Sequence, residues 1–339
     1  NSLYIHDGAN IVVDGTLSVY VDALRADDGM VVESGDVATG ALISIEGVVT
    51  AGELGITTYS ETDLVYLVGI AGNTPTTVDT GSGDDNVLLR NVAANSPLTI
   101  HAADGDDTVL IGSNASWTLA SFPTATNTNG DLNSINDLVT VDLGSGATDQ
   151  LLLDETGQTV ISQVGYVTAS TVRGFGMTPN VGADDATGGI IYSNVEQLNL
   201  NLGEQEDVVY VRSTNSDTTT TINTGDTTAN SVQIGSELNI ESSLLNAIAG
   251  DLVVNGQSSN DTLSVHDNAE SSDNAGVLTQ TTIAGFGIGL GKLVTYADIE
   301  TLNVELGQAR DTLLVMSTHA GTTNIYGKAA DDVIQAQQI

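Results

Sequence analysis

A short pattern of glycine, paired aspartates and an apolar run is written twice in this sequence at a fixed spacing. "TGSGDDNVLL" occupies residues 80–89, and "AADGDDTVLI" follows 22 positions later at 102–111. A related run, "DLVYL", starts at Asp63, which again lies 22 positions before Asp85. Self-similarity at a fixed period of this size indicates that one supersecondary unit is stacked on the next.

The same pattern continues along the rest of the chain. Further runs, "DQLLL", "DVVYV", "DTLSV", "DTLLV" and "DDVIQ", begin at Asp149, Asp207, Asp261, Asp311 and Asp331. The second and fourth residues after most of these aspartates are Val, Leu or Ile, a period-two placement that turns side chains to one face of a strand. We therefore predict an all-β chain that forms a parallel β-helix (β-solenoid), right-handed by the crossover rule, with rungs of about 22 residues.

A longer repeat overlies the short one and sets the expected domain organisation. "STVRGFGM" (170–177) matches "TTIAGFGI" (281–288), and Tyr192 and Tyr296 lie 104 residues apart in matching contexts. We expect one solenoid domain made of three degenerate cassettes, at 1–112, 138–235 and 251–339. Polar segments rich in Ser, Thr, Asn, Asp and Gly are expected to leave the coils as loops, at about 23–50, 113–137, 154–170 and 267–280. The only segment with helical character is 236–251.

Composition excludes several classes of partner and site. The chain has 7 Lys+Arg against 44 Asp+Glu, for a formal net charge of −37, so we expect neither nucleic acid nor an anionic lipid surface as a partner. No apolar run is long enough for membrane insertion. The absence of cysteine excludes disulfides, thiolate metal sites and cysteine nucleophiles.

The stretches "GSGDDNVLL" and "ADGDDTVLI" resemble the calcium-binding nonapeptides of RTX, or hemolysin-type, secreted proteins, whose pattern is G-G-x-G-x-D-x-U-x. The resemblance implies Ca²⁺ bound by aspartate carboxylates and turn carbonyls. Stacked Asp85 and Asp107 would place like charges one rung apart, which a hard cation with oxygen ligands would relieve. The candidate metal residues are Gly81, Gly83, Asp84, Asp85, Asp104, Gly105, Asp106 and Asp107. The alternative is that each aspartate accepts a backbone N–H bond of its own turn.

This chain departs from that family in two ways. RTX nonapeptides follow each other every nine residues, whereas one glycine turn per rung of about 22 residues occurs here. Later turns lose the pattern, and Arg310 and Lys328 place cations where a metal would lie. The larger cassette, with "GFG" followed by "YSNVEQLNLNLG", is similar to repeats of very large bacterial surface proteins and adhesins.

The third residue after each aspartate should point away from the core, yet it is apolar or aromatic in most copies. These residues are Tyr66, Leu88, Leu110, Leu152, Tyr210 and Leu314. A row of such side chains predicts a cover, supplied by the chain's own loops or by a neighbouring molecule. The chain also begins and ends inside the repeat, from which we expect self-association, end to end or lateral, or a longer parent protein.

Catalytic signals are weak. His6-Asp7 and His266-Asp267 follow equivalent strands but share no recurring third partner, so both are interpreted as turns leaving the coil. No G-x-S-x-G elbow occurs, and the basic residues are scattered. We expect a non-catalytic extracellular structural repeat protein, either a segment of a giant surface protein or the subunit of a filament, with calcium at the Asp/Gly turns. The alternatives are an adhesin or carbohydrate-binding module that recognises surface glycans, and a β-helix polysaccharide lyase or hydrolase.

Overall fold

The structure is a computed structural model that describes residues 2–20, 40–118, 125–179, 187–257 and 260–337. The chain divides into two compact units, unit 1 (1–154 and 176–196) and unit 2 (155–175 and 197–339). Both are built from short strands joined by turns, and the single helix among the described residues is a 3-10 turn at Ile240–Ser242. None of the described helices has the length and apolar character needed to cross a bilayer.

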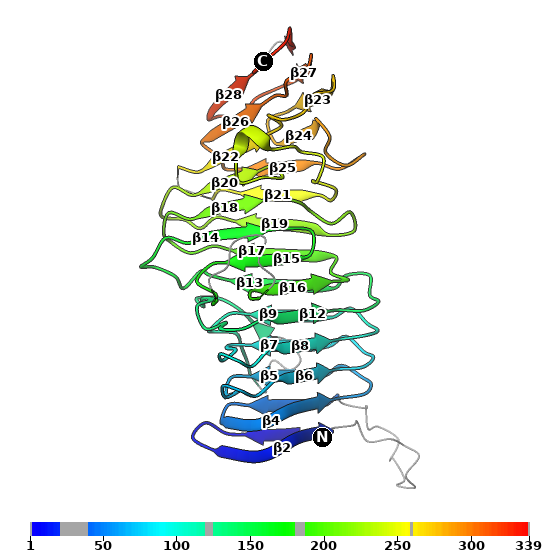
Figure 1. Ribbon diagram of the computed structural model, residues 1–339, viewed down its shortest axis with the longest axis vertical. Coiled ribbons are helices and arrows are strands. Elements are labelled where there is room, and N and C mark those ends of the chain that lie inside the picture. The colour runs from blue at the N-terminus through cyan, green and yellow to red at the C-terminus, as the bar shows by residue number, and fades with distance from the viewer. Residues whose placement is uncertain (1, 21–39, 119–124, 180–186, 258–259, 338–339) are drawn as a thin grey trace. The chain divides into compact units, whose positions relative to one another are not determined.

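Unit 1 contains two sets of parallel strands, and successive strands alternate between the sets (Figure 1). The first set is β1 Ser2–Ile5, β3 Leu42–Ile45, β5 Leu64–Leu67, β7 Asn86–Leu89, β9 Thr108–Ile111 and β13 Gln150–Asp154. The second set is β2 Asn10–Tyr20, β4 Val48–Thr57, β6 Thr76–Asp79, β8 Leu98–His101, β12 Val139–Asp142 and β16 Ile190–Ser193. All neighbouring pairs within each set run parallel. The alternating apolar pattern of the sequence thus corresponds to two sheets, each made of parallel strands.

The pairing register of these strands places similar residues next to each other on neighbouring strands. Val65 pairs with Val87 and Val87 with Val109, and all three are at most 1% exposed. In the second set Val78 pairs with Ile100, and both are fully buried. Each column of aliphatic side chains fills the interior, because equivalent positions in adjacent coils point to the same side.

Unit 2 also contains two sets of strands. One is β17 Gln197–Asn201, β19 Thr219–Asn223, β21 Leu252–Asn255, β25 Val294–Ala297, β24 Thr282–Gly285, β23 Ala275–Leu278, β27 Thr312–Val315 and β29 Val333–Ala336. The other is β15 Thr171–Gly174, β14 Val164–Val167, β18 Val208–Val211, β20 Ser231–Ile234, β22 Thr262–His266, β26 Thr301–Glu305 and β28 Thr322–Tyr326. Most pairs are parallel, but β14–β15, β23–β24 and β24–β25 are antiparallel. The prediction of an all-β chain with long parallel sheets, as in a β-solenoid, is confirmed.

The "GFG" repeat corresponds to two equivalent hairpins in unit 2. In β14–β15 the ring of Phe175 lies over Gly165, and in β23–β24 the ring of Phe286 lies over Gly276, so that a Cβ on either glycine would overlap the ring. The expectation of loops at 154–170 and 267–280 was therefore wrong in part, because β14 and β23 pair within the sheets. The 23–50 segment likewise holds β3 and the start of β4.

A second apolar cluster, here called the outer cluster, lies on the far side of the first sheet of unit 1. Its buried members are Leu42, Leu64, Tyr66, Leu88, Leu110 and Ala115. Val68, Trp117, Ala125 and Leu152 pack against it, and two of these come from a hairpin of β10 Ser116–Trp117 and β11 Ala125–Thr126. Described residues of the chain's own 113–137 excursion, namely Ala115, Trp117 and Ala125, thus cover outward-facing Leu and Tyr side chains, the first of the two covers that the sequence predicted. Leu152, Tyr210 and Leu314 are only half-buried.

Candidate functional site

The predicted metal residues lie in the glycine turns that precede β7 and β9, and these turns are stacked on one another. Gly83 and Gly105 have φ of +136° and +143°, and Gly81 has φ of +91°. A Cβ on Gly83 would overlap the Glu61 carbonyl, and one on Gly105 would overlap the Gly83 carbonyl. The glycines of the motif are therefore required by the close approach of one turn to the next, with or without a metal ion.

The aspartates directly before β5, β7, β9 and β13, namely Asp63, Asp85, Asp107 and Asp149, form a continuous column in unit 1, which we call the aspartate column. The Asp85 Oδ1 atom accepts a bond from the Asp63 backbone N–H at 2.7 Å, and Asp107 accepts from the Asp85 N–H at 2.8 Å. Asp149 accepts from the Asp107 N–H at 2.7 Å, and Glu196 Oε2 accepts from the Asp149 N–H at 3.0 Å. Each side chain thus bonds the neighbouring coil, where the sequence-based alternative had placed the bond within its own turn.

In three members of this column the second carboxylate oxygen is buried without a hydrogen bond among the described residues. Asp85 and Asp107 are 1% exposed and Asp149 is fully buried, and none of their Oδ2 atoms has a partner among the described residues. Burial raises the pKa of Asp85 from 3.8 to about 8, that of Asp107 to about 7 and that of Asp149 to about 6, although the backbone hydrogen bonds lower these values in part. At pH values above 3.8 and below these raised pKa values, the folded column therefore holds protons that free aspartates release.

The remaining predicted carboxylates lie on the exposed side of the same turns. The Asp84 Oδ1 atom accepts the Asp106 backbone N–H at 3.0 Å, and Asp106 accepts the backbone N–H groups at 147 and 148 at 2.8 and 3.1 Å. These bonds lower the pKa of Asp106. Asp104 accepts the Ser145 hydroxyl at 2.6 Å. Hydrogen bonds thus favour the charged form of Asp106 on the exposed side, while burial favours neutral carboxyl groups in the column.

Calcium takes six to eight oxygen ligands from carboxylates, carbonyls and water, so a site needs several such oxygens that converge on one point. Within the described ranges, no group of three or more His, Cys, Asp and Glu side chains is placed to hold a metal ion. Asp85 and Asp107 are turned into the protein, whereas Asp84, Asp104 and Asp106 face outward, so the carboxylates of the motif are divided between two sides. Calcium binding stays a prediction, and in this arrangement it depends on the three outward carboxylates.

Unit 2 contains an equivalent column in which other residues take the same role. Asp207 Oδ1 accepts the Gln163 N–H at 2.6 Å, Asn230 Oδ1 accepts the Asp207 N–H at 2.8 Å, and Asp261 accepts the Asn230 N–H at 2.7 Å. Glu300 Oε2 accepts the Asp261 N–H at 2.8 Å. Aspartate, asparagine and glutamate therefore occupy equivalent places in this column, because each supplies a carbonyl-type acceptor.

Asn230 also shows that a hydrogen-bond donor suits the buried side of such a column. Its Nδ2 group donates to the carbonyl of Thr224 and to that of Thr228, the latter at 3.0 Å. The corresponding atom of an aspartate is Oδ2, which can donate to such carbonyls only when it carries a proton. Sequence reasoning missed Asn230, Glu196 and Glu300, although each directly precedes a strand, as the aspartates do.

The two His-Asp pairs have different surroundings. His6 is exposed and its ring stacks on Tyr4 with centroids 5.9 Å apart. His266 is the last residue of β22, is 4% exposed, and contacts Glu305 and Gln233 on neighbouring strands. No pattern in the sequence pointed to these partners, which lie 39 and 33 positions away.

No protein-family model, no curated protein and no solved structure matches this chain.

Proposed function

We propose that the chain is a non-catalytic structural repeat segment of an extracellular surface protein, belonging to a giant surface protein or a filament. The observation that carries this proposal is how the recurring residues are used within the fold. The aspartates that recur before the strands use their side chains to bond one coil to the next, and the glycines of the motif allow the turns to stack. Repeat proteins are stabilised by such contacts between neighbouring units.

The proposed architecture is a right-handed parallel β-helix with rungs of about 22 residues, lengthened where excursions are inserted. Paired positions along β3, β5, β7 and β9 support the rung size, since each residue pairs with one 22 positions further on. The right hand is the default for crossovers between parallel strands.

Charge supports an extracellular setting for this protein. A net charge of −37 repels other polyanions and keeps a protein soluble, and it draws cations to the surface. We propose that Ca²⁺ associates with the exposed side of these turns, through the outward carboxylates of Asp84, Asp104 and Asp106 together with turn carbonyls and water, and stiffens that edge. Self-association, end to end or lateral, is the partner interaction that such a segment would use.

Localisation tests the proposal directly. Immunogold electron microscopy with antibodies against this chain is expected to label layers or filaments outside the cell envelope. Labelling confined to the cell interior, or native material that consists only of dispersed monomers, would overturn the structural role.

Calcium has a separate test, because a ligand bound only by the folded state raises the melting temperature. The melting temperature should be higher with calcium than with chelator, and the difference should vanish in the Asp84→Asn/Asp104→Asn/Asp106→Asn variant. Asp7→Asn, which removes an exposed carboxylate from a different turn, should keep the difference. Identical melts of the unmodified chain with and without calcium would remove calcium from the proposal.

A groove in unit 2 favours carbohydrate binding as a second candidate function. It has a volume of about 560 Å³ and is lined in part by Gln280, Thr281, Asp298, Glu300 and His319. Amide, hydroxyl and carboxylate groups in a concave site are suited to sugar hydroxyls. Binding to a glycan array that is lost in Asp298→Ala would support this role, and an array without binding would exclude it for the glycans presented.

A further inference from the structure

The groove in unit 2 lies where an inserted hairpin separates two turns of the fold. In one sheet β23 and β24 lie between β25 and β27, whereas β26 and β28, the strands that follow the two turns, pair directly. At the usual spacing of neighbouring strands, β25 and β27 are about 14 Å apart, and β26 and β28 are about 4.8 Å apart. The two turns therefore diverge around the hairpin tip, and the groove is lined by these three segments, 280–281, 296–300 and 318–321.

Four polar side chains of this lining have no hydrogen bond to another described residue. Gln280 and Thr281 lie at the hairpin tip, Asp298 lies in the turn after β25, and Thr318 lies in the turn after β27. The first three are exposed and Thr318 is half-buried. An amide, two hydroxyls and a carboxylate from three segments thus line one concave surface and are free to bind a ligand.

The counterparts of two of these residues in the preceding cassette, 104 positions earlier, are used within the fold. Asp298 and its counterpart Asn194 both have a left-handed backbone, with φ of +52° and +54°. However, the Asn194 amide donates to Asp142 Oδ1 at 2.6 Å. Thr214, the counterpart of Thr318, is 2% exposed, and its hydroxyl bonds two backbone groups of the next excursion at 2.8 and 3.1 Å. The same repeat positions therefore have a structural role in one cassette and none in the described part of the other.

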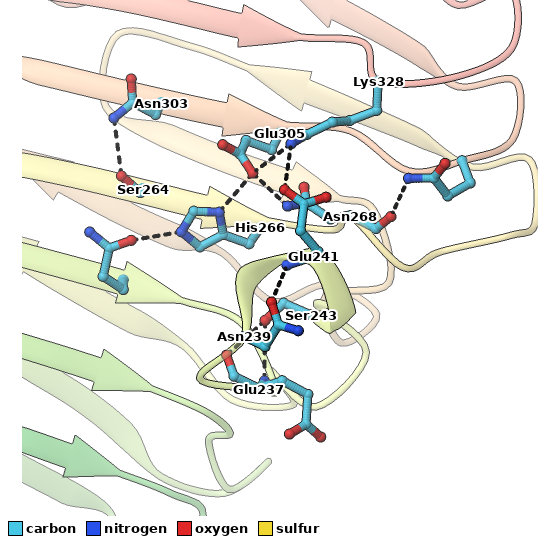
Figure 2. A network of polar contacts seen from close by, with 12 residues as sticks. Glu237, Asn239, Glu241, Ser243, Ser264, His266, Asn268, Asn303, Glu305 and Lys328 are labelled. Atoms are coloured by element: carbon cyan, nitrogen blue, oxygen red, sulfur yellow. Dashed lines mark hydrogen bonds and ion pairs between the residues drawn. The ribbon is translucent and has the colours of Figure 1, made fainter.

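Negative charge dominates the groove. Its lining includes two carboxylates, Asp298 and Glu300, and no lysine or arginine lines it in the described part of unit 2. Lys328, in the turn after β28, lies 3.3 Å from Glu305 and 3.6 Å from Glu241 and is thus paired elsewhere (Figure 2). A cleft lined by charge of one sign concentrates ligands of the opposite sign.

A ligand that fits this lining has both a positive charge and hydroxyl groups. A protonated amine forms charge-assisted hydrogen bonds to a carboxylate, which are stronger than neutral ones. Threonine hydroxyls and a glutamine amide each donate and accept, as sugar hydroxyls do. A metal ion fits less well, because no group of three or more His, Cys, Asp and Glu side chains within the described ranges is placed to hold one. Acidic sugars are repelled by the two carboxylates.

We propose that the groove binds a glycan with a free, protonated amino group, with the ammonium at Asp298 and neighbouring sugar hydroxyls at Gln280, Thr281 and Thr318. This inference rests on carbohydrate binding, the second candidate function, and names the class of sugar that the groove selects. The volume of about 560 Å³ lies within the usual range of ligand sites, so the groove accommodates a short oligosaccharide.

Isothermal titration calorimetry of the full-length chain with two matched trisaccharides tests the role of charge. Both are glucosamine trimers, one with free amines and one N-acetylated, so they share rings and linkage. With calcium chelated and salt at about 0.15 M to screen the surface, the free-amine trimer should bind about tenfold more tightly than the acetylated trimer. Equal affinities would overturn the amino-sugar assignment while leaving carbohydrate binding in place, and binding of neither trimer would overturn both.

Two variants locate the binding. Asp298→Asn introduces the residue that adopts the same backbone at Asn194, so it should fold and lose about tenfold in affinity for the free-amine trimer. Asp217→Asn, at an exposed carboxylate in the turn after β18, is the matched control for attraction to the acidic surface and should bind as the unmodified chain does. Equal affinities of the two variants would contradict the site. Trilysine, which has amines but no hydroxyls, would overturn the sugar assignment if it bound as tightly and with the same dependence on Asp298.

Discussion

Replacing Asp85 with asparagine should reduce the number of protons that unit 1 takes up on folding by almost one. The introduced amide side chain would keep an Oδ1 atom to accept the Asp63 N–H, which Asp85 accepts at 2.7 Å. It would also place an NH₂ group where the buried Oδ2 atom has no partner, as Asn230 does naturally in unit 2. We therefore expect Asp85→Asn to fold and to keep the coil-to-coil bond.

The magnitude follows from the pKa of Asp85, which burial raises from 3.8 to about 8. Between these values the folded chain holds a proton that the unfolded chain has released, so stability falls as pH rises, by about 1.4 kcal/mol per pH unit for one proton. From about pH 5 to about pH 7, Asp85 alone should cost the chain about 3 kcal/mol. The full stability contribution is present only below the ordinary aspartate pKa.

Urea unfolding followed by tryptophan fluorescence is the suitable assay, because the chain's one tryptophan, Trp117, packs on the outer cluster of unit 1. The free energy of unfolding should be measured at several pH values between about 5 and 7, with chelator present to remove calcium effects. The slope for Asp85→Asn should be shallower than that of the unmodified chain by about 1.4 kcal/mol per pH unit. Asp7→Asn, which changes an exposed carboxylate in a different turn, should leave the slope unchanged. Equal slopes for the unmodified chain and Asp85→Asn would refute the argument that the buried oxygen holds a proton.

Two further substitutions test the packing. Gly276→Ala should destabilise unit 2 by about 1–3 kcal/mol, because the added Cβ would overlap the Phe286 ring. Gly55→Ala is the control, because a Cβ at Gly55 would meet no atom within 4 Å. Equal melting temperatures for the two variants would contradict the hairpin packing. Leu88→Ala should lower the free energy of unfolding by about 2–5 kcal/mol and shift the Trp117 emission to longer wavelength, since Leu88 is fully buried in the outer cluster. Val12→Ala, at a residue that is 66% exposed, should change the free energy of unfolding by less than about 0.5 kcal/mol. An unchanged Trp117 emission in Leu88→Ala would show that the outer cluster does not cover the sheet.

The parts of the fold that repeat in sequence were predictable. Val65, Val87 and Val109 recur every 22 positions, and their pairing follows because equal coil lengths keep the register. The glycine turns were predictable for the same reason. The hairpins at Phe175 and Phe286 were not, since nothing in a "GFG" motif indicates that its phenylalanine packs on a glycine of the preceding strand.

The chemistry of the candidate site was predictable only in its residue types. Asp85 and Asp107 were expected at one edge with Asp84 and Asp106, and they do share the turns. However, alternation along the chain buries one aspartate of each pair and exposes the other, and no sequence pattern states which oxygens a neighbouring coil will use. His266 was missed because its partners come from strands brought together only by the coiling.

The aspartate column has a consequence for how a chain of this kind can vary over evolutionary time. The residues joined by successive bonds of the column lie 22, 42 and 47 positions apart, yet the bond itself is the same at each step. Insertions between two such residues are therefore tolerated, whereas deletion of one residue inside the strand that follows the acceptor would shift its register by one and turn its apolar side chains to the opposite face. Genes for such proteins should accumulate length differences in the segments that connect the coils and almost none at the residues where the strands begin.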